Sequence, residues 1–139
     1  GMTPLYGASL EDNVDIVQLL LARKEIQINV SSSFDTSDTP LSAACSSGND
    51  DVVRLLLDRE EIDVNQADEN GNTPLYNACR KNWSGIVRLL LAKEDIDINK
   101  VTTDGWTALD LVWYMGFEKL VKLLKLKGGV YKKYVSRNS

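Results

Sequence analysis

The chain has 139 residues, of which 43% are hydrophobic and 26% are charged, and these are ordinary values for one globular domain. It contains no apolar run of the roughly 20 residues that span a bilayer and no secretory signal, so we expect a cytoplasmic protein. The net charge is −4, so the chain has no broad basic face for nucleic acid. Residues 107–139 hold 7 of the 16 basic residues but only 2 of the 20 acidic ones, and we interpret this local basic cluster as a solvated C-terminal end.

One short motif recurs at a nearly constant spacing. Its copies begin at Thr3, Thr39, Thr73 and Thr107, and the first three read Thr-Pro-Leu. A period of 20 to 50 residues is the signature of a repeat architecture. Threonine is a good N-cap and proline suits the first helical turn, so we expect first helices to begin near residues 4, 40, 74 and 108.

Each first helix should be short. Asp12, Gly48, Asn82 and Gly116 stand at equivalent places after the four motifs. These residue types tolerate the left-handed conformation that ends a helix. We therefore predict that the first helices stop there.

A second helix should follow in every repeat, at residues 16–21, 52–57, 86–91 and 120–125. Apolar residues occupy so many of these positions that one helix cannot cover them, and neighbouring repeats must do so. We predict that the central leucines, Leu20, Leu56, Leu90 and Leu124, are buried.

The segments after the first three second helices alternate between apolar and polar residues, but four residues are too few to predict a strand. Asn70-Gly71 then predicts a tight turn. Each repeat is thus helix, turn, helix and an extended finger, with the first finger longer and Ser-rich. Asn29, Asn65 and Asn99 recur in the fingers, and we interpret them as residues that fix the finger.

The turn, the two helices and the Thr-Pro-Leu motif resemble the ankyrin repeat over residues 3–129. The resemblance implies an all-α solenoid of stacked helix-turn-helix units with finger loops. It divides a single domain, residues 1–139, into repeats at 3–38, 39–72, 73–106 and 107–130 and a tail at 131–139. The histidine of the family motif is replaced by Tyr6, Ser42, Tyr76 and Asp110.

The two ends of the array should differ. Lys125 replaces the third leucine of the Leu-Leu-Leu triplet that the other second helices share. The bulky Trp113 stands in the slot of Ser9, Cys45 and Cys79, so we predict a C-terminal cap. The start shows no polar adaptation, which favours a longer array. Successive repeats place Cys45 and Cys79 too far apart for a disulfide, so we expect two reduced, buried thiols.

The motifs of common catalytic and metal sites are missing. The chain has no histidine, no CxxC pair and no glycine-rich phosphate loop. We therefore expect that the protein is not an enzyme and that it binds no cofactor and no metal. The acidic pairs Asp50-Asp51 and Glu60-Glu61 are interpreted as solvated charges at helix ends.

The resemblance implies a protein-interaction module that binds through finger tips and the exposed, concave side of the first helices. The matching positions are Asp38, Ser46, Ser47, Glu69, Asn70, Asn72, Arg80, Lys81, Thr103, Asp104, Trp106, Tyr114 and Met115. We predict that the chain is a monomer and that its partner is a protein of mixed charge. Binding should be strongest toward the C-terminal half. The alternative is a targeting or regulatory domain of a larger enzyme or membrane protein.

Overall fold

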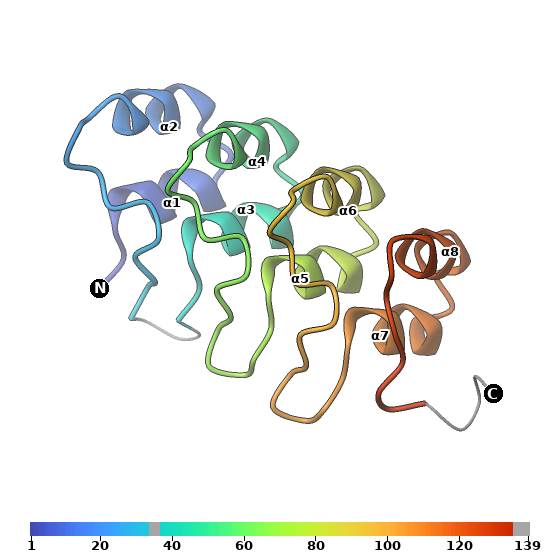
Figure 1. Cartoon of the computed structure of the whole chain (residues 1–139). Coiled ribbons are helices and arrows are strands. Elements are labelled where there is room, and N and C mark those ends of the chain that lie inside the picture. The colour runs from blue at the N-terminus through green and yellow to red at the C-terminus, as the bar shows by residue number, and fades with distance from the viewer. Residues whose placement is uncertain (34–36, 135–139) are drawn as a thin grey trace.

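The computed structural model describes residues 1–33 and 37–134, and in that part of the chain it contains eight α-helices arranged as four pairs (Figure 1). The pairs are α1 (Pro4–Leu10) with α2 (Val14–Leu21), α3 (Pro40–Ser47) with α4 (Asp50–Leu57), α5 (Pro74–Arg80) with α6 (Ser84–Leu91), and α7 (Ala108–Met115) with α8 (Glu118–Leu126). No strand occurs in these two stretches. The architecture is therefore the all-α solenoid that the sequence predicts.

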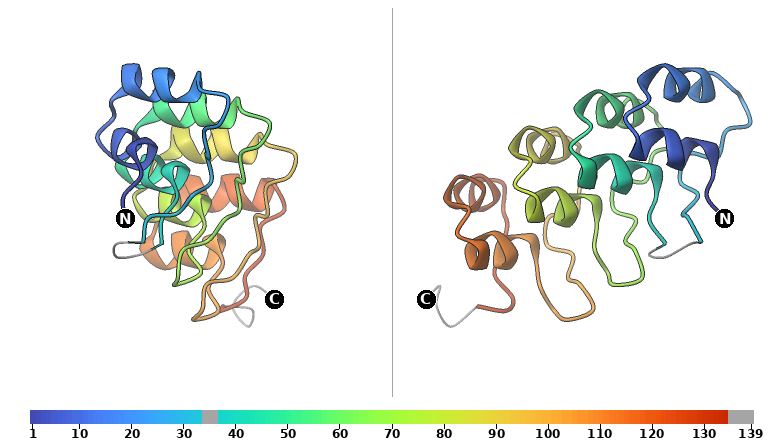
Figure 2. Two further views of the ribbon diagram at one scale, coloured as in Figure 1. Left: turned by 90° about the vertical axis from the view of Figure 1, so that its left-hand side faces the viewer. Right: turned by 180° about the vertical axis from the view of Figure 1, so that it is seen from behind.

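The helices form two layers. The first helices of the pairs lie side by side in one layer, the second helices lie in the other, and the loops after α2, α4 and α6 extend beyond the first-helix layer (Figures 1 and 2). We call these loops the finger loops. Each helix packs against its own partner, and the helices α1 to α7 also pack against a helix of an adjacent pair. The predicted length of the first finger involves residues 34–36, which lie outside the described residues.

Local sequence determines where each first helix begins and ends. The threonine hydroxyl at each N-cap accepts the backbone N–H three residues later, at 3.1 Å in all four pairs. After each first helix, one residue adopts positive φ: Asp12 at 57°, Gly48 at 75°, Asn82 at 60° and Gly116 at 78°. Both predictions for the first helices are confirmed.

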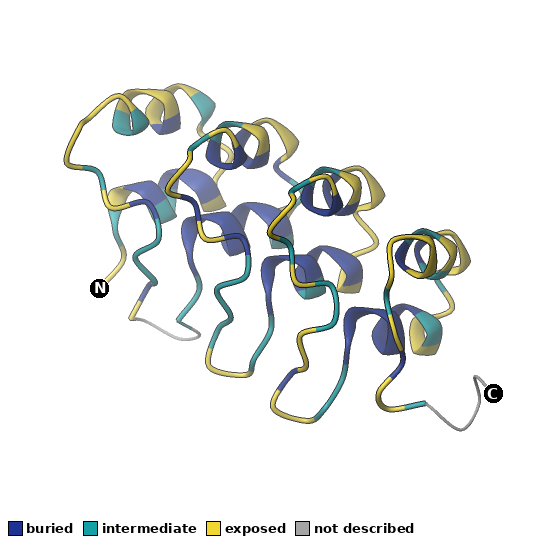
Figure 3. Ribbon diagram, viewed as in Figure 1, coloured by how far each residue is buried: buried dark blue, intermediate teal, exposed yellow. Residues whose placement is uncertain are grey.

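The core lies between the layers and between the pairs (Figure 3). Leu56, Leu90 and Leu124 are wholly buried, as predicted. The prediction for Leu20 is wrong, because this side chain is only half-buried. Its helix, α2, packs against α4 on one side, whereas no described helix covers its other side.

The recurring asparagines join successive repeats. The Asn29 amide donates to the Glu61 carbonyl at 2.7 Å and accepts the Asp63 N–H at 2.8 Å. Asn65 makes the same two bonds one repeat later, at 2.7 and 2.8 Å, and Asn99 makes them with the last repeat, at 3.1 and 2.8 Å. We call this series of bonds the asparagine ladder. It confirms that these residues fix the fingers.

The C-terminal end differs from the interior as expected. Ser9, Cys45 and Cys79 are wholly buried, whereas Trp113 in the same slot is half-buried and Lys125 is exposed. The Lys125 ammonium lies 5.7 Å from the centroid of the Tyr131 ring. Both cysteines are free, and burial raises the pKa of their thiols, that of Cys79 to about 12.

Candidate functional site

The predicted binding residues fall into two groups. The first group lies on the finger loops and consists of Asp38, Glu69, Asn70, Asn72, Thr103, Asp104 and Trp106. The second group lies at the C-terminal ends of the first helices and consists of Ser46, Ser47, Arg80, Lys81, Tyr114 and Met115. Asp38, Ser46, Asn72 and Trp106 are half-buried, and the other nine residues are exposed. Every member of the set therefore offers surface to solvent.

Backbone and carboxylate hydrogen bonds order the tip of the finger after α4. The Asp68 carboxylate accepts the N–H groups of Asn70 and Asn72 at 2.8 and 2.9 Å. The Asp68 N–H in turn donates to the Asn72 carbonyl at 3.0 Å. Glu69 and Asn70 are thus presented at the tip of a closed turn.

The next tip is tied to this one. The Thr103 N–H and hydroxyl both donate to the Asn70 carbonyl, at 3.0 and 3.1 Å. Gly71, at φ +77°, permits this approach, because a Cβ there would lie 2.8 Å from the Thr103 nitrogen. The two tips therefore form one continuous polar edge.

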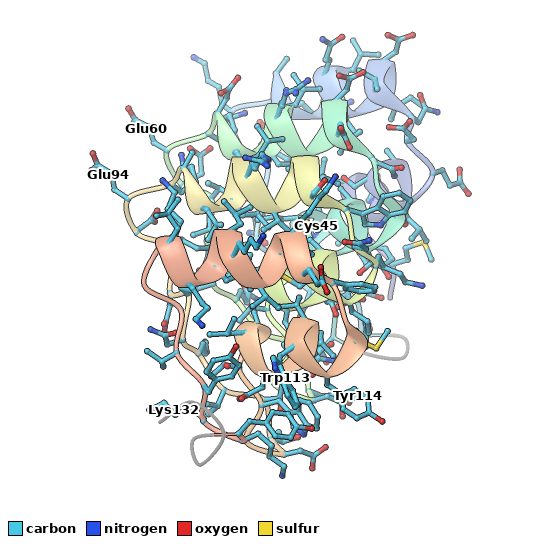
Figure 4. All side chains as sticks on the ribbon, turned by 90° about the vertical axis from the view of Figure 1, so that its right-hand side faces the viewer. Cys45, Glu60, Glu94, Trp113, Tyr114 and Lys132 are labelled. Atoms are coloured by element: carbon cyan, nitrogen blue, oxygen red, sulfur yellow. The ribbon has the colours of Figure 1, made fainter. Side chains whose placement is uncertain are left out.

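An aromatic cluster joins the last finger to α7. The rings of Trp106 and Tyr114 meet edge to face with centroids 5.5 Å apart, and Trp106 and Tyr134 meet in the same way at 5.5 Å. The ring centroids of Trp113 and Tyr134 lie 4.6 Å apart. Figure 4, which looks onto the α7–α8 end, shows Trp113 and Tyr114 extending from α7. The predicted residues Trp106 and Tyr114 are thus in direct contact.

Sequence reasoning missed the contribution of residues 130–134. We assigned residues 131–139 to a tail, but Tyr131 is buried and Tyr134 belongs to the aromatic cluster. The Lys133 ammonium lies 5.9 Å from the Trp106 ring centroid and donates to the Asp104 carbonyl at 3.2 Å. These residues extend the candidate surface beyond the predicted set.

The wholly buried Asp110 holds this segment in place. Its carboxylate accepts the backbone N–H groups of Lys132, Lys133 and Tyr134 at 3.0–3.3 Å, and that of Thr107 at 2.9 Å. Burial alone raises the pKa of Asp110, but the hydrogen bonds from Thr107, Lys133 and Lys132 outweigh it and lower the pKa below its ordinary value. We call this arrangement the Asp110 clamp. The Thr107-x-x-Asp110 capping box is the part of this arrangement that the sequence could have shown, whereas the bonds to residues 132–134 have no sequence signal.

Charges of both signs border the aromatic cluster. Arg80 and Lys81 are exposed on α5 and at its end, and the Arg80 guanidinium is oriented by a 2.7 Å bond to the Asn77 side-chain oxygen. Glu69 and Asp104 are exposed on the neighbouring tips. The surface therefore combines aromatic area with separated positive and negative groups.

The corresponding surface of the second repeat is less prominent. Ser46 is half-buried, and its carbonyl accepts the Trp83 indole N–H at 3.1 Å. Ser47 is exposed but small, and Asp38 is half-buried at the base of its finger. Large anchors are absent from this group of predicted residues.

The described residues contain no group of three or more His, Cys, Asp or Glu side chains that could hold a metal ion. None of the helices in residues 1–33 and 37–134 is long and apolar enough to cross a bilayer. A shallow, open hollow of about 420 Å³ lies beside Trp113 and is lined also by Gly116, Glu118, Val121 and Lys122. It is open to solvent and mostly apolar.

The comparison with known protein families agrees with the helix-pair architecture. A family model for ankyrin repeats in three copies matches residues 1–68 and, in a second alignment, residues 60–134. A search of curated proteins gave no match.

Proposed function

The chain belongs to the ankyrin-repeat family, whose repeats generally mediate protein–protein interactions, and from this premise we propose that it is a non-catalytic, monomeric module that binds a protein partner. The partner docks on the finger tips and on the exposed ends of the first helices, most strongly in the C-terminal half. We propose that the module consists of four repeats, at residues 3–38, 39–72, 73–106 and 107–130.

The observation that carries the proposal is the exposed aromatic surface at the last finger. The Tyr114 side chain is 65% exposed and Met115 is 45% exposed, although both are large and hydrophobic. Tyr114 is also held edge to face by Trp106, so its ring loses little freedom when a partner covers it. Rigid aromatic side chains in such positions are typical binding hot spots.

The charges beside this surface favour a protein over a nucleic acid. Arg80, Lys81 and Lys133 provide positive groups, whereas Glu69 and Asp104 place negative groups on the adjacent tips. A polyanion would meet repulsion at these two carboxylates, and a partner with separated acidic and basic groups would complement them. We therefore propose a protein segment of mixed charge.

The test begins by isolating partners on the immobilised chain and purifying one for titration calorimetry. We expect Tyr114→Ala to weaken binding by about 1–4 kcal/mol. Trp106→Ala should weaken it by a similar amount, but Trp106 also contacts Tyr134, so Tyr114 is the cleaner probe.

The matched control is Arg54→Ala on the opposite layer, where the side chain is 59% exposed and forms a 3.8 Å ion pair with Asp51. This change should leave the affinity unchanged. Circular dichroism verifies that all variants keep their helix content. If Arg54→Ala abolishes binding while Tyr114→Ala does not, the proposed surface is wrong.

A further inference from the structure

The outer side of the first helix pair exposes apolar residues that the other repeats bury. Ile16 on α2 is 44% exposed, whereas its equivalents Val52, Ile86 and Leu120 are 0–1% exposed. Leu19 is 70% exposed, whereas its equivalents in the later repeats are half-buried. Each later repeat has another helix pair before it in the stack, whereas no described helix pair precedes α1–α2 (Figure 1).

The same side carries free ends of the asparagine ladder. In the later repeats, the asparagine of the preceding finger bonds to one carbonyl and one N–H after the second helix, as Asn29 does with Glu61 and Asp63. The equivalent groups in the first repeat are the Glu25 carbonyl and the Gln27 N–H. Neither has a hydrogen-bond partner among residues 1–33 and 37–134. Both residues are exposed.

A third contact recurs between the ends of the first helices. Asn49, which precedes α4, donates its amide to the Ser9 and Leu10 carbonyls at 2.8 and 3.2 Å. Trp83 stands in the same slot and donates to the Ser46 carbonyl. Asn13 is the equivalent in the first repeat, and its amide nitrogen donates to no residue that the structure describes.

A fourth contact recurs at the ends of the second helices. The Arg59 guanidinium donates to the Leu21 carbonyl, and the Lys93 ammonium donates to the Leu57 carbonyl at 2.9 Å. The equivalent residue of the first repeat is Arg23, which is exposed and makes no such bond within the described ranges.

We propose that this side of α1–α2, which we call the N-terminal stacking face, binds one further repeat of the same class. The face continues an interface that recurs between successive repeats: the asparagine ladder is present at all three junctions, and the third and fourth contacts are present at the first two. Its occupant must carry an apolar second helix, free carbonyls at the ends of both helices, and an asparagine in its finger. The proposal is independent of the proposed function, since it concerns the opposite end of the solenoid.

A second copy of this chain, docked head to tail, fits the face poorly. Lys132 stands in the slot of the ladder asparagines, so the last repeat cannot supply the amide that Glu25 and Gln27 require. Lys125 also places an exposed charge where Leu57 and Leu91 meet the following repeat. The occupant is therefore a repeat with the sequence character of residues 39–72 or 73–106.

The test extends the full chain with a copy of residues 73–106 joined directly before Thr3, in place of Gly1 and Met2. We expect the unfolding midpoint to rise and the amide hydrogen exchange of Gln27 to slow by about tenfold or more. The same extension with Asn99→Ala in the copied segment should lose the protection of Gln27 while the added helices remain folded.

The recipient face provides a second variant. The double change Ile16→Gln and Leu19→Gln should remove most of the gain in the unfolding midpoint from the extension, but should change the unextended chain little, since both side chains are exposed there. No change in either measurement on extension would overturn the proposal. It would also be overturned if the unextended chain dimerises in sedimentation experiments and Ile16→Gln abolishes the dimer, because a second copy would then be the occupant.

Discussion

Substitution of Asp110 by asparagine tests the clamp at the C-terminal end. The native carboxylate accepts four backbone N–H groups, and the Thr107 hydroxyl, whose single hydrogen is shared with the Val130 carbonyl at 2.8 Å, lies 3.0 Å from Oδ2. The amide nitrogen of an asparagine side chain cannot accept a hydrogen bond. The N–H groups that donate to the oxygen it replaces therefore lose their acceptor. If Oδ2 is the atom replaced, the N–H groups of Thr107 and Lys133 lose their acceptor.

The expected size of the effect follows from these two bonds. Hydrogen bonds to a charged group contribute about 1.5–3 kcal/mol each. Lys133 is exposed, so its N–H can turn to water, whereas the wholly buried Thr107 N–H cannot. We therefore expect Asp110→Asn to lower the free energy of unfolding by about 2–4 kcal/mol, measured by chemical denaturation at pH 7. Tryptophan emission should shift to the red as Trp106 and Trp113 lose Tyr134.

The same variant has a signature in pH. The hydrogen bonds lower the folded-state pKa of Asp110 below its unfolded value of about 3.9, so the carboxylate stabilises the fold above roughly pH 4 and this contribution is lost as pH falls through the folded-state pKa. Asp110→Asn should remove that part of the acid dependence. Asp51→Asn, a matched charge change on the exposed surface of α4, should alter stability by less than about 0.5 kcal/mol. Equal stability of wild type and Asp110→Asn at pH 7 would refute the clamp.

Three further predictions concern the core and are measured on the purified chain. Leu56→Ala should cost about 2–5 kcal/mol in denaturant unfolding, whereas Leu20→Ala should cost clearly less because its side chain is only half-buried; equal costs would contradict the packing of α2. Ser9→Ala should stabilise the fold by about 1 kcal/mol, since the buried Ser9 hydroxyl has no hydrogen-bond partner among the described residues; a loss of stability would indicate a bonded hydroxyl. Cys45 and Cys79 should resist thiol reagents in the folded protein and both react after denaturation, and a count below two free thiols would refute their reduced state.

The sequence predicts the helix pairs well because their signals are local. A threonine cap and a residue suited to the left-handed conformation fix each end within a few positions, whatever the rest of the chain does. Leu20 shows the limit of this reasoning. It has the same sequence neighbours as Leu56, but its burial depends on a helix pair beyond its own repeat.

The candidate surface shows a second limit. Contact between Trp106 and Tyr114 follows from the repeat register and could be anticipated. The position of Tyr134 depends on hydrogen bonds from the backbone N–H groups of residues 132–134 to Asp110. Every residue type except proline carries such an N–H group, so the sequence does not reveal these bonds. The assignment of the thirteen residues to a partner stays a prediction.

The position of the Asp110 clamp sets how the molecule should respond to mechanical force. Successive pairs are joined by helix packing and by the asparagine ladder, and the last pair has its own step of the ladder through Asn99. The clamp lies within the last pair, where it joins residues 132–134 to α7. A pull on the two termini should therefore load the clamp before it loads the interface between α5–α6 and α7–α8, and residues 132–134 should detach from α7 before the last pair separates.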